Sequence, residues 1–169
     1  MKTQDYNGEA WNIGIGHLAG YAVTTGIRNT LVGGIAGDSI TTGSYNTVFG
    51  SHALATQTTG GGNTAIGYAA LNALNHTDDA VGYNVAIGHE AGAVMTTGIY
   101  NTIIGGLAGD ALTTGNKNVA IGYKALSTED AHTGNVAIGY LALEDQNAGA
   151  DAYNTAIGYE AGKVVTTGV

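Results

Sequence analysis

Cysteine and proline are absent from this 169-residue chain, and phenylalanine and tryptophan occur once each. The lack of cysteine excludes disulfides and thiol chemistry, although it selects no cellular compartment. A chain of this length has enough material for one ordinary domain with a buried core. That core must consist mainly of Ala, Ile, Leu and Val, and the 29 glycines favour thin, closely stacked layers.

Basic residues are scarce as well. The chain has 5 Lys plus Arg against 13 Asp plus Glu, a formal net charge of -8. Because the few basic residues form no stripe, we expect no nucleic-acid partner. The start MKTQDYNGEAW has no apolar segment typical of a signal peptide, and no run of about 18 apolar residues predicts membrane insertion. The basic residues are Lys2, Arg28, Lys117, Lys124 and Lys163.

One phrase recurs along the chain and sets its period. Asn-Val-Ala-Ile-Gly-Tyr begins at Asn118 and again at Asn135, seventeen positions later, and related phrases bring the number to nine. The same interval separates most neighbouring units, and only the units that begin at Asn63 and Asn135 are longer and carry insertions. Such a period is typical of solenoid proteins. The units begin at Asn12, Asn29, Asn46, Asn63, Asn84, Asn101, Asn118, Asn135 and Asn154.

Four positions of the unit hardly vary: the first Asn, a large apolar residue three places later, the Gly that follows it, and an Ala three places after the Gly. Equivalent residues of successive coils lie about 4.8 Å apart in a solenoid, so each position becomes a ladder along the axis. We expect the asparagine ladder to hydrogen-bond from coil to coil. We expect the apolar ladder to form the core, with Ile15, Val32, Phe49, Ile66, Ile87, Ile104, Ile121, Ile138 and Ile157.

Each unit has the local pattern of β structure. In Asn-Thr-Ala-Ile-Gly the side chains alternate, with Thr and Ile on one face and Asn, Ala and Gly on the other. Frequent Gly and Thr-Thr-Gly breaks disfavour a helix. We therefore predict one strand, a tight Gly bend, a shorter Ala-containing strand and a Thr-Thr-Gly turn per unit. The predicted fold class is an all-β parallel β-solenoid, a β-roll or β-helix of about nine 17-residue coils.

A longer rhythm groups four coils into a super-repeat. Ile-Gly-His at 15–17 returns at 87–89, four units further along. The predicted solenoid domain, 12–169, contains super-repeats 12–83 and 84–153 and a final coil 154–169. Residues 1–11 are expected to form a partial N-terminal coil or cap, because Trp11 occupies the position of Tyr83 and Tyr153 in the long units. Both ends stop inside the pattern, so we expect a segment of a longer fibre or molecules that stack end to end.

The phrases NTAIGYxAL and the TTG spacers from Asn12 to Val169 resemble the repeats of tail-fibre-like proteins of phages and marine bacteria. They are similar, more loosely, to the head repeats of trimeric autotransporter adhesins. The resemblance implies a homotrimer that forms a shaft or head and attaches to a surface. Adhesin heads use somewhat shorter coils than those found here. The shared motif is scaffold, so no binding residues are carried over.

Two ladders are candidates for binding. A tyrosine row follows the invariant Gly, at Tyr68, Tyr123, Tyr140 and Tyr159, and could stack on sugar rings. Packing between protomers or over the Gly bend is the alternative, which we favour. A Thr-Thr-Gly ladder also occurs in ice-binding solenoids, but here the two Thr of each pair should point to opposite sides. A turn is therefore the preferred interpretation.

Metal and modification signals are weak. His17 and His89 share a column four coils apart, which is too far for one metal within a chain, and a site across a trimer axis is the alternative. The acidic pairs are expected to be solvated turn charges rather than a weak Ca²⁺ site. Asn75-His76-Thr77 fits the glycosylation pattern. The acidic pairs are Asp78-Asp79, Glu129-Asp130 and Glu144-Asp145.

The sequence thus predicts a structural fibre or adhesion segment, homotrimeric, extracellular or on a virion surface. It predicts no catalysis, cofactor or metal. A cell-surface glycan or receptor is a possible further partner. One alternative is a head-to-tail self-assembling filament, and another is an ice- or glycan-binding solenoid module.

Overall fold

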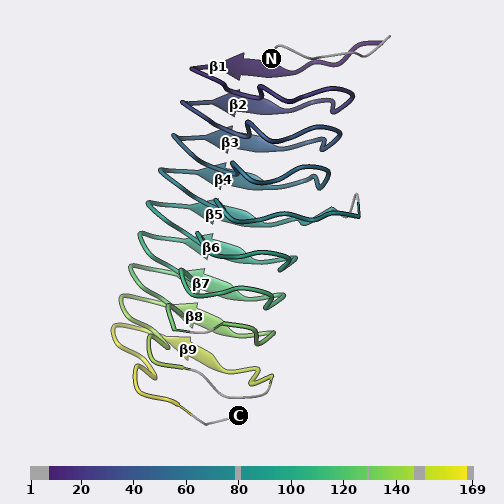
Figure 1. Cartoon of the computed structure of the whole chain (residues 1–169). Helices are drawn as coiled ribbons and strands as arrows, with labels where there is room; N and C mark the ends of the chain where they lie inside the picture. Colours follow the sequence, from purple (N-terminus) through teal and green to yellow (C-terminus); the bar gives the residue numbers. More distant parts are fainter. Residues whose placement is uncertain (1–7, 79–80, 129, 147–150, 167–169) are drawn as a thin grey trace.

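The computed structural model describes residues 8–78, 81–128, 130–146 and 151–166. It is a β-solenoid in which one short strand per coil stacks on the next (Figure 1), as predicted from the period. The predicted cap, residues 1–11, falls partly outside the described residues, as do Asp79 and Glu129 of the acidic pairs. The strands of the described residues are β1 (Ile13–Ile15), β2 (Thr30–Val32), β3 (Thr47–Phe49), β4 (Thr64–Ile66), β5 (Val85–Ile87), β6 (Thr102–Ile104), β7 (Val119–Ile121), β8 (Val136–Ile138) and β9 (Thr155–Ile157).

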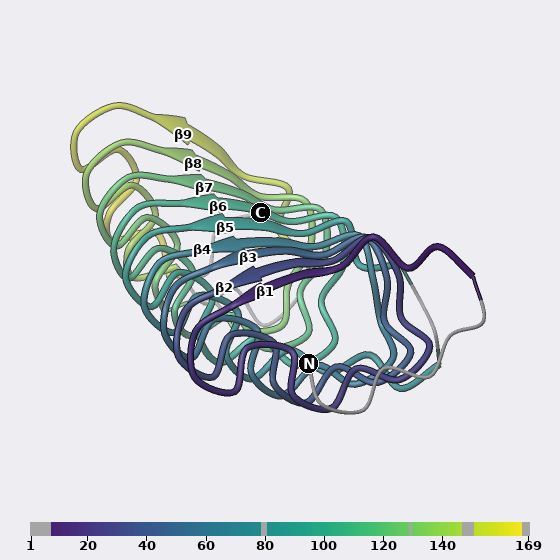
Figure 2. The same ribbon diagram turned by 90° about the horizontal axis from the view of Figure 1, so that it is seen from above.

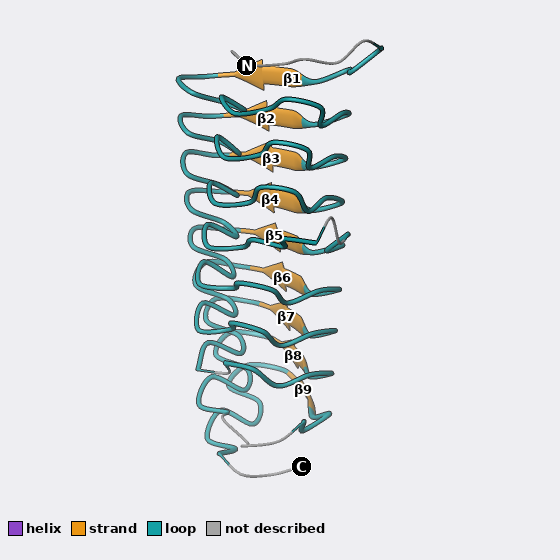
Figure 3. Ribbon diagram, turned by 45° about the vertical axis from the view of Figure 1, so that its right-hand side comes forward, coloured by secondary structure: helices purple, strands orange, loops and turns teal. Residues whose placement is uncertain are grey.

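All nine strands form one parallel sheet in sequence order, along one side of the solenoid (Figure 3). Every strand residue pairs with the residue at the same position of the next unit, so Leu31 lies beside Val48. The register holds across the longest unit, where Ala65 pairs with Ala86. The inserted residues are therefore accommodated outside the strands.

The asparagine at the start of each unit holds the coils together from inside. At all eight steps, the side-chain oxygen of one asparagine accepts a hydrogen bond from the backbone N–H of the next, at 2.8–3.2 Å. In most coils the amide nitrogen also donates to a carbonyl oxygen of the turn in its own coil, as in Asn84 to Gly98 O at 2.8 Å. Asn84 and Asn101 are fully buried. The predicted ladder therefore links neighbouring coils and also closes most coils on themselves.

The second, Ala-containing strand predicted for each unit does not occur in the described residues; turns take its place. The residues on either side of the invariant Ala have positive φ, for example Ile35 at 62° and Gly37 at 53° around Ala36. A chain that alternates between right- and left-handed residues curls instead of extending. The backbone still bonds to the neighbouring coils, as Gly37 N–H does to Ala53 O at 3.0 Å.

The predicted core ladder was assigned to the wrong side of the strand. Side chains alternate as expected, but from β2 to β8 the middle residue of the strand points inward together with the asparagine, and the first and third point outward. Phe49 is 50% exposed, while Val48 beside it is buried. The interior is narrow because the turns also project side chains into it. The predicted core residues instead lie on the outer face, with Ile15, Phe49, Ile66 and Ile157 exposed and Val32, Ile87, Ile104, Ile121 and Ile138 half-buried.

The true core has strand residues on one side and turn residues on the other. The invariant alanines from Ala19 to Ala142 are buried, and so are several residues four places after them, including Val23, Ile40 and Met95. At the position after the invariant Ala, Gly occurs opposite the large strand residues Leu31 and Ile103, because the two positions share space; Leu54 opposite Val48 is an exception. A Cβ on Gly37 would lie 2.9 Å from Leu31 Cδ2 and 2.8 Å from Ile40 Cδ1. Where this position is Leu71, Leu126 or Leu143, the strand residue is Ala.

This exchange of volume can be tested by moving a leucine across the core. Gly37→Leu alone should destabilise the chain by about 1–3 kcal/mol because the site is filled. Leu31→Ala alone should cost about 2–5 kcal/mol because it leaves a cavity. The double variant copies the Ala65 and Leu71 arrangement of another coil and should recover much of the loss. Chemical denaturation measures all three, and strictly additive losses would contradict the exchange.

The glycine after each strand is required by the neighbouring coil. Gly122 has a φ of 134°, and a Cβ there would lie 2.3 Å from the carbonyl oxygen of Gly139. Gly158 in the last coil has almost the same φ, 132°, but its nearest neighbour would be Ala161 Cβ at 3.9 Å. The two positions therefore separate backbone strain from contact between coils.

Gly122→Ala should destabilise the solenoid by about 1–3 kcal/mol more than Gly158→Ala. Both alanines carry the strain of a positive φ, and only the first meets a backbone oxygen. Thermal unfolding followed by circular dichroism compares the two variants. Equal losses would show that strain, and not close stacking, selects glycine here.

Candidate surface: the strand face and its borders

The first and third residues of all nine strands form one continuous outer surface, called here the strand face. The third residue is Ile, Val or Phe in every strand, and the first is Thr, Val or Ile. None of the residues of the strand face is charged. The strand arrows change direction steadily from β1 to β9 in the end-on view (Figure 2), so the face is twisted.

Two columns border the strand face, one on each side. The leading column directly precedes the asparagines, and the trailing column directly follows the glycines. Sequence reasoning missed the leading column, although aromatic or basic residues at seven of its nine positions were a readable signal. The leading column is Trp11, Arg28, Tyr45, Gly62, Tyr83, Tyr100, Lys117, Gly134 and Tyr153. The trailing column is His17, Gly34, Ser51, Tyr68, His89, Gly106, Tyr123, Tyr140 and Tyr159.

Rings in both columns stack on one another along the axis. Tyr140 lies between Tyr123 and Tyr159, with centroids 5.7 and 5.2 Å away and interplanar angles of 17° and 10°. Tyr68 contacts His89 at 5.3 Å and 23°. Since a sugar stacks on the face of a ring, and both faces of Tyr140 are covered, this geometry does not support glycan stacking on Tyr140.

The leading column begins with a cation–π sandwich. The guanidinium carbon of Arg28 lies 4.9 Å from the ring centroid of Trp11 and 5.4 Å from that of Tyr45. Its Nη1 also donates to the Tyr45 hydroxyl at 2.9 Å. Arg28 thus covers one face of Tyr45 and holds its ring in place.

Acidic residues lie away from the strand face. None of the 13 Asp and Glu occupies the strand face or its two bordering columns. Glu144, on the turn side, is 3.4 Å from Lys163 Nζ and 3.9 Å from Lys124 Nζ. These partly exposed pairs contribute little to stability. The chain therefore keeps its acidic residues away from its apolar strand face.

Two equivalent aspartates on the turn side, Asp38 and Asp110, are partly buried. The pKa of each carboxyl is raised, mainly because burial removes water from the charged form. Backbone N–H donors oppose this rise, as do the charge of His52 at Asp38 and the charge of Lys124 at Asp110. One oxygen of each carboxylate is buried without a hydrogen-bond partner.

The remaining sequence candidates act within the scaffold. Thr41 and Thr113 donate their hydroxyls to carbonyl oxygens of the following coil, Thr58 O and Asp130 O, as a turn ladder would. Asn75 accepts from the backbone N–H and the hydroxyl of Thr58, at 3.1 and 2.9 Å. Its side chain is therefore engaged in the solenoid. His76 is buried, with Nε2 3.2 Å from Thr97 O.

Asp110→Asn should stabilise the folded chain at pH 7. Because folding raises the carboxyl pKa above 3.8, the unfolded chain ionises first, so stability falls as the pH rises from 3.8 through the raised value and stays lower above it. The advantage of the variant should shrink as the pH falls through the folded pKa and be lost below 3.8. Urea denaturation from pH 7 to pH 3 measures this difference. The explanation would be refuted if the variant were less stable than the unmodified chain at pH 7. It would also be refuted if the advantage of the variant were the same at pH 7 and at pH 3.

No helix of the described residues is long and apolar enough to cross a membrane, and no three His, Asp or Glu residues there are grouped to hold a metal ion. Comparison with protein-family models, curated proteins and solved structures found no match. A role for this chain therefore has to be argued from its own surfaces.

Proposed function

We propose that the chain is a structural fibre or adhesion segment that assembles as a homotrimer through its strand face. The observation that carries this proposal is an apolar outer sheet face without charge on a chain of net charge -8. The resemblance to tail-fibre-like repeats and adhesin heads points to the same role. The proposal assigns the chain no catalysis, and it locates the rod outside the cell or on a virion surface.

The size of the strand face supports burial against a partner. Nine strands at about 4.8 Å spacing extend for roughly 40 Å, and the two outward ranks lie about 7 Å apart. This surface is comparable with the few hundred Å² found for the largest apolar patch of a typical monomer. Phe49 and Ile15 are among its exposed side chains. Water contact with so many aliphatic groups is unfavourable.

The charge distribution favours copies of the same chain as partners. When two identical surfaces meet, any carboxylates on them would repel one another and would be costly to desolvate. The strand face has no acidic residue and therefore avoids both costs. The acidic turns stay in water on the outside of the assembly. The twist of the sheet (Figure 2) suits subunits that wrap around a common axis better than it suits a flat ice surface.

The mechanism of such a rod is mechanical. Each coil bonds to its neighbours by backbone hydrogen bonds on the strand side and the turn side, for example Gly88 N–H to Ile66 O at 2.8 Å and Thr96 N–H to Thr113 O at 2.8 Å. Stacked coils therefore resist bending and local opening. Three copies would present each surface feature three times, so that weak contacts to a surface add through avidity.

Ile66→Glu tests assembly through the strand face. The side chain is 36% exposed, so a glutamate there leaves the chain folded in isolation but places a charge inside the proposed interface. We expect mass photometry to show a trimer for the unmodified chain and mainly single chains for this variant, with an unchanged β-type circular dichroism spectrum.

Val94→Glu is the matched control, since Val94 is 44% exposed on the turn side. It should keep the assembled mass. A single-chain mass for the unmodified protein, or assembly that survives Ile66→Glu, would rule out the proposed interface.

A further inference from the structure

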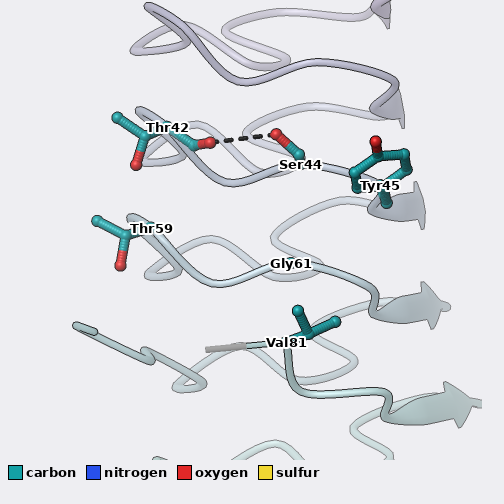
Figure 4. Close-up of a pocket in the computed structure, with 6 residues that line it drawn as sticks. All are labelled: Thr42, Ser44, Tyr45, Thr59, Gly61 and Val81. Carbon is teal, nitrogen blue, oxygen red and sulfur yellow. Dashed lines mark hydrogen bonds between the residues drawn. The ribbon is translucent and has the colours of Figure 1, made fainter. Parts of the chain in front are cut away.

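A hollow of about 290 Å³ opens between three successive coils at the leading column (Figure 4). Tyr45 lies at one end of this hollow and Val81 at the other, with Gly61 on the coil between them. Thr42, Ser44 and Thr59 complete the lining. The lining thus contains aromatic, aliphatic and hydroxyl groups and no charged side chain. A volume near the lower end of the range for ligand pockets fits one small ring.

The hollow exists because the aromatic ladder is interrupted. Position 62 of the leading column is Gly, so no ring covers the face of Tyr45 that is turned toward the next coil. Arg28 covers the opposite face, 5.4 Å from the ring centroid, and its bond to the Tyr45 hydroxyl fixes the ring. Tyr45 is 55% exposed. Unlike Tyr140, which lies between two rings, it offers one open face in a hollow.

The insertion in the coil that begins at Asn63 supplies the second wall. Val81 forms a parallel bridge with Gly61, and Gly82 N–H donates to Gly61 O at 2.9 Å. This pairing holds Val81 under the hollow, where 42% of it is exposed. Where Gly62 leaves no ring beside Tyr45, the longer coil instead contributes the two methyl groups of Val81 to the lining of the hollow.

Hydroxyl groups along one side give the hollow its polarity. Ser44 Oγ donates to Thr42 O at 3.2 Å and accepts from Ile27 N–H at 3.0 Å. Thr59 donates to His76 O at 2.8 Å. A hydroxyl oxygen has two lone pairs, so a group that already donates can also accept from the hydroxyl of a ligand. An open aromatic face, two methyl groups and hydroxyl acceptors match the apolar face and hydroxyl edge of a pyranose ring.

We infer that this hollow binds one neutral hexopyranose residue of a glycan, stacked on Tyr45. The inference rests on the proposed function, because it gives the surface-attachment role a ligand class. Thr42 and Thr59 belong to the Thr-Thr-Gly turns, so the hollow lies beside the strand face and its lining contains no residue of that face.

The second super-repeat provides an internal comparison. Gly134 again interrupts the leading column, but Lys117 takes the place of Tyr45 and Asp151 that of Val81. Asp151 Oδ1 accepts from Thr133 N–H at 3.1 Å. The same scaffold position therefore lacks both the aromatic face and the methyl groups. Lys117 has a φ of 57° against 62° for Tyr45, so the exchange is compatible with the backbone.

The test converts the first hollow into the second with Tyr45→Lys/Val81→Asp. Saturation-transfer NMR is recorded on the full chain with methyl glycosides of glucose, galactose, mannose and N-acetylglucosamine. We expect transfer to the ring protons of at least one glycoside, reduced several-fold in the double variant. Tyr100→Lys is the matched control, because Tyr100 is in the same column, 50% exposed, with a φ of 61°. The control should keep the signal.

Absence of transfer to every glycoside would overturn the inference, as would equal loss in Tyr100→Lys or full retention in the double variant. Mass photometry of the same samples reports assembly separately. A trimer that binds no glycoside refutes the hollow and leaves the proposed rod standing. A single chain that binds through Tyr45 refutes the trimer and supports the hollow.

Discussion

The coils of this solenoid depend on a ladder of asparagine amides that is buried from Asn29 to Asn135. Each oxygen of this ladder accepts the backbone N–H of the next asparagine, and most of the amide nitrogens donate to a turn carbonyl across the interior, as Asn101 does to Gly115 O at 2.9 Å. A shorter or apolar side chain would leave buried backbone groups unpaired, which costs about 1–3 kcal/mol for each group. The ladder therefore fixes both the register between coils and the width of each coil, and the other columns must fit that width.

The narrow interior explains which residues can occupy it. The strand contributes one side chain per coil, and the turn contributes the invariant Ala and two neighbours. Leu31 opposite Gly37 and Ala65 opposite Leu71 are two ways to fill the same space. Large residues at both positions of every coil would exceed the volume. Glycine is then required where backbones of adjacent coils nearly touch, as at Gly122 and Gly139.

The period, the parallel strands and the asparagine ladder could be predicted from the sequence, because identical residues one period apart must stack. The orientation of the strand could not be read from hydrophobicity, since both of its faces are apolar. The exchange of size between Leu31 and Gly37, absent from the uniform Ile column, would have identified the inner face. The turns were missed because Ile35 and Lys124 adopt positive φ, which sequence reasoning assigns mainly to glycine. The hollow at Tyr45 depends on the pairing of Val81 with Gly61 in a longer coil, which the repeat does not specify.

Repetition and its exceptions therefore serve different purposes in this molecule. A column that repeats in every coil, such as the Ile ladder of the strand face, yields a surface that is uniform along the axis and suits assembly of identical chains. Recognition of a ligand needs a place that differs from its surroundings. Here the difference arises where Gly62 removes one ring and a longer coil brings Val81 beneath the gap. A solenoid can acquire such a site by one substitution and one insertion, because neither change disturbs the buried asparagines that hold the coils.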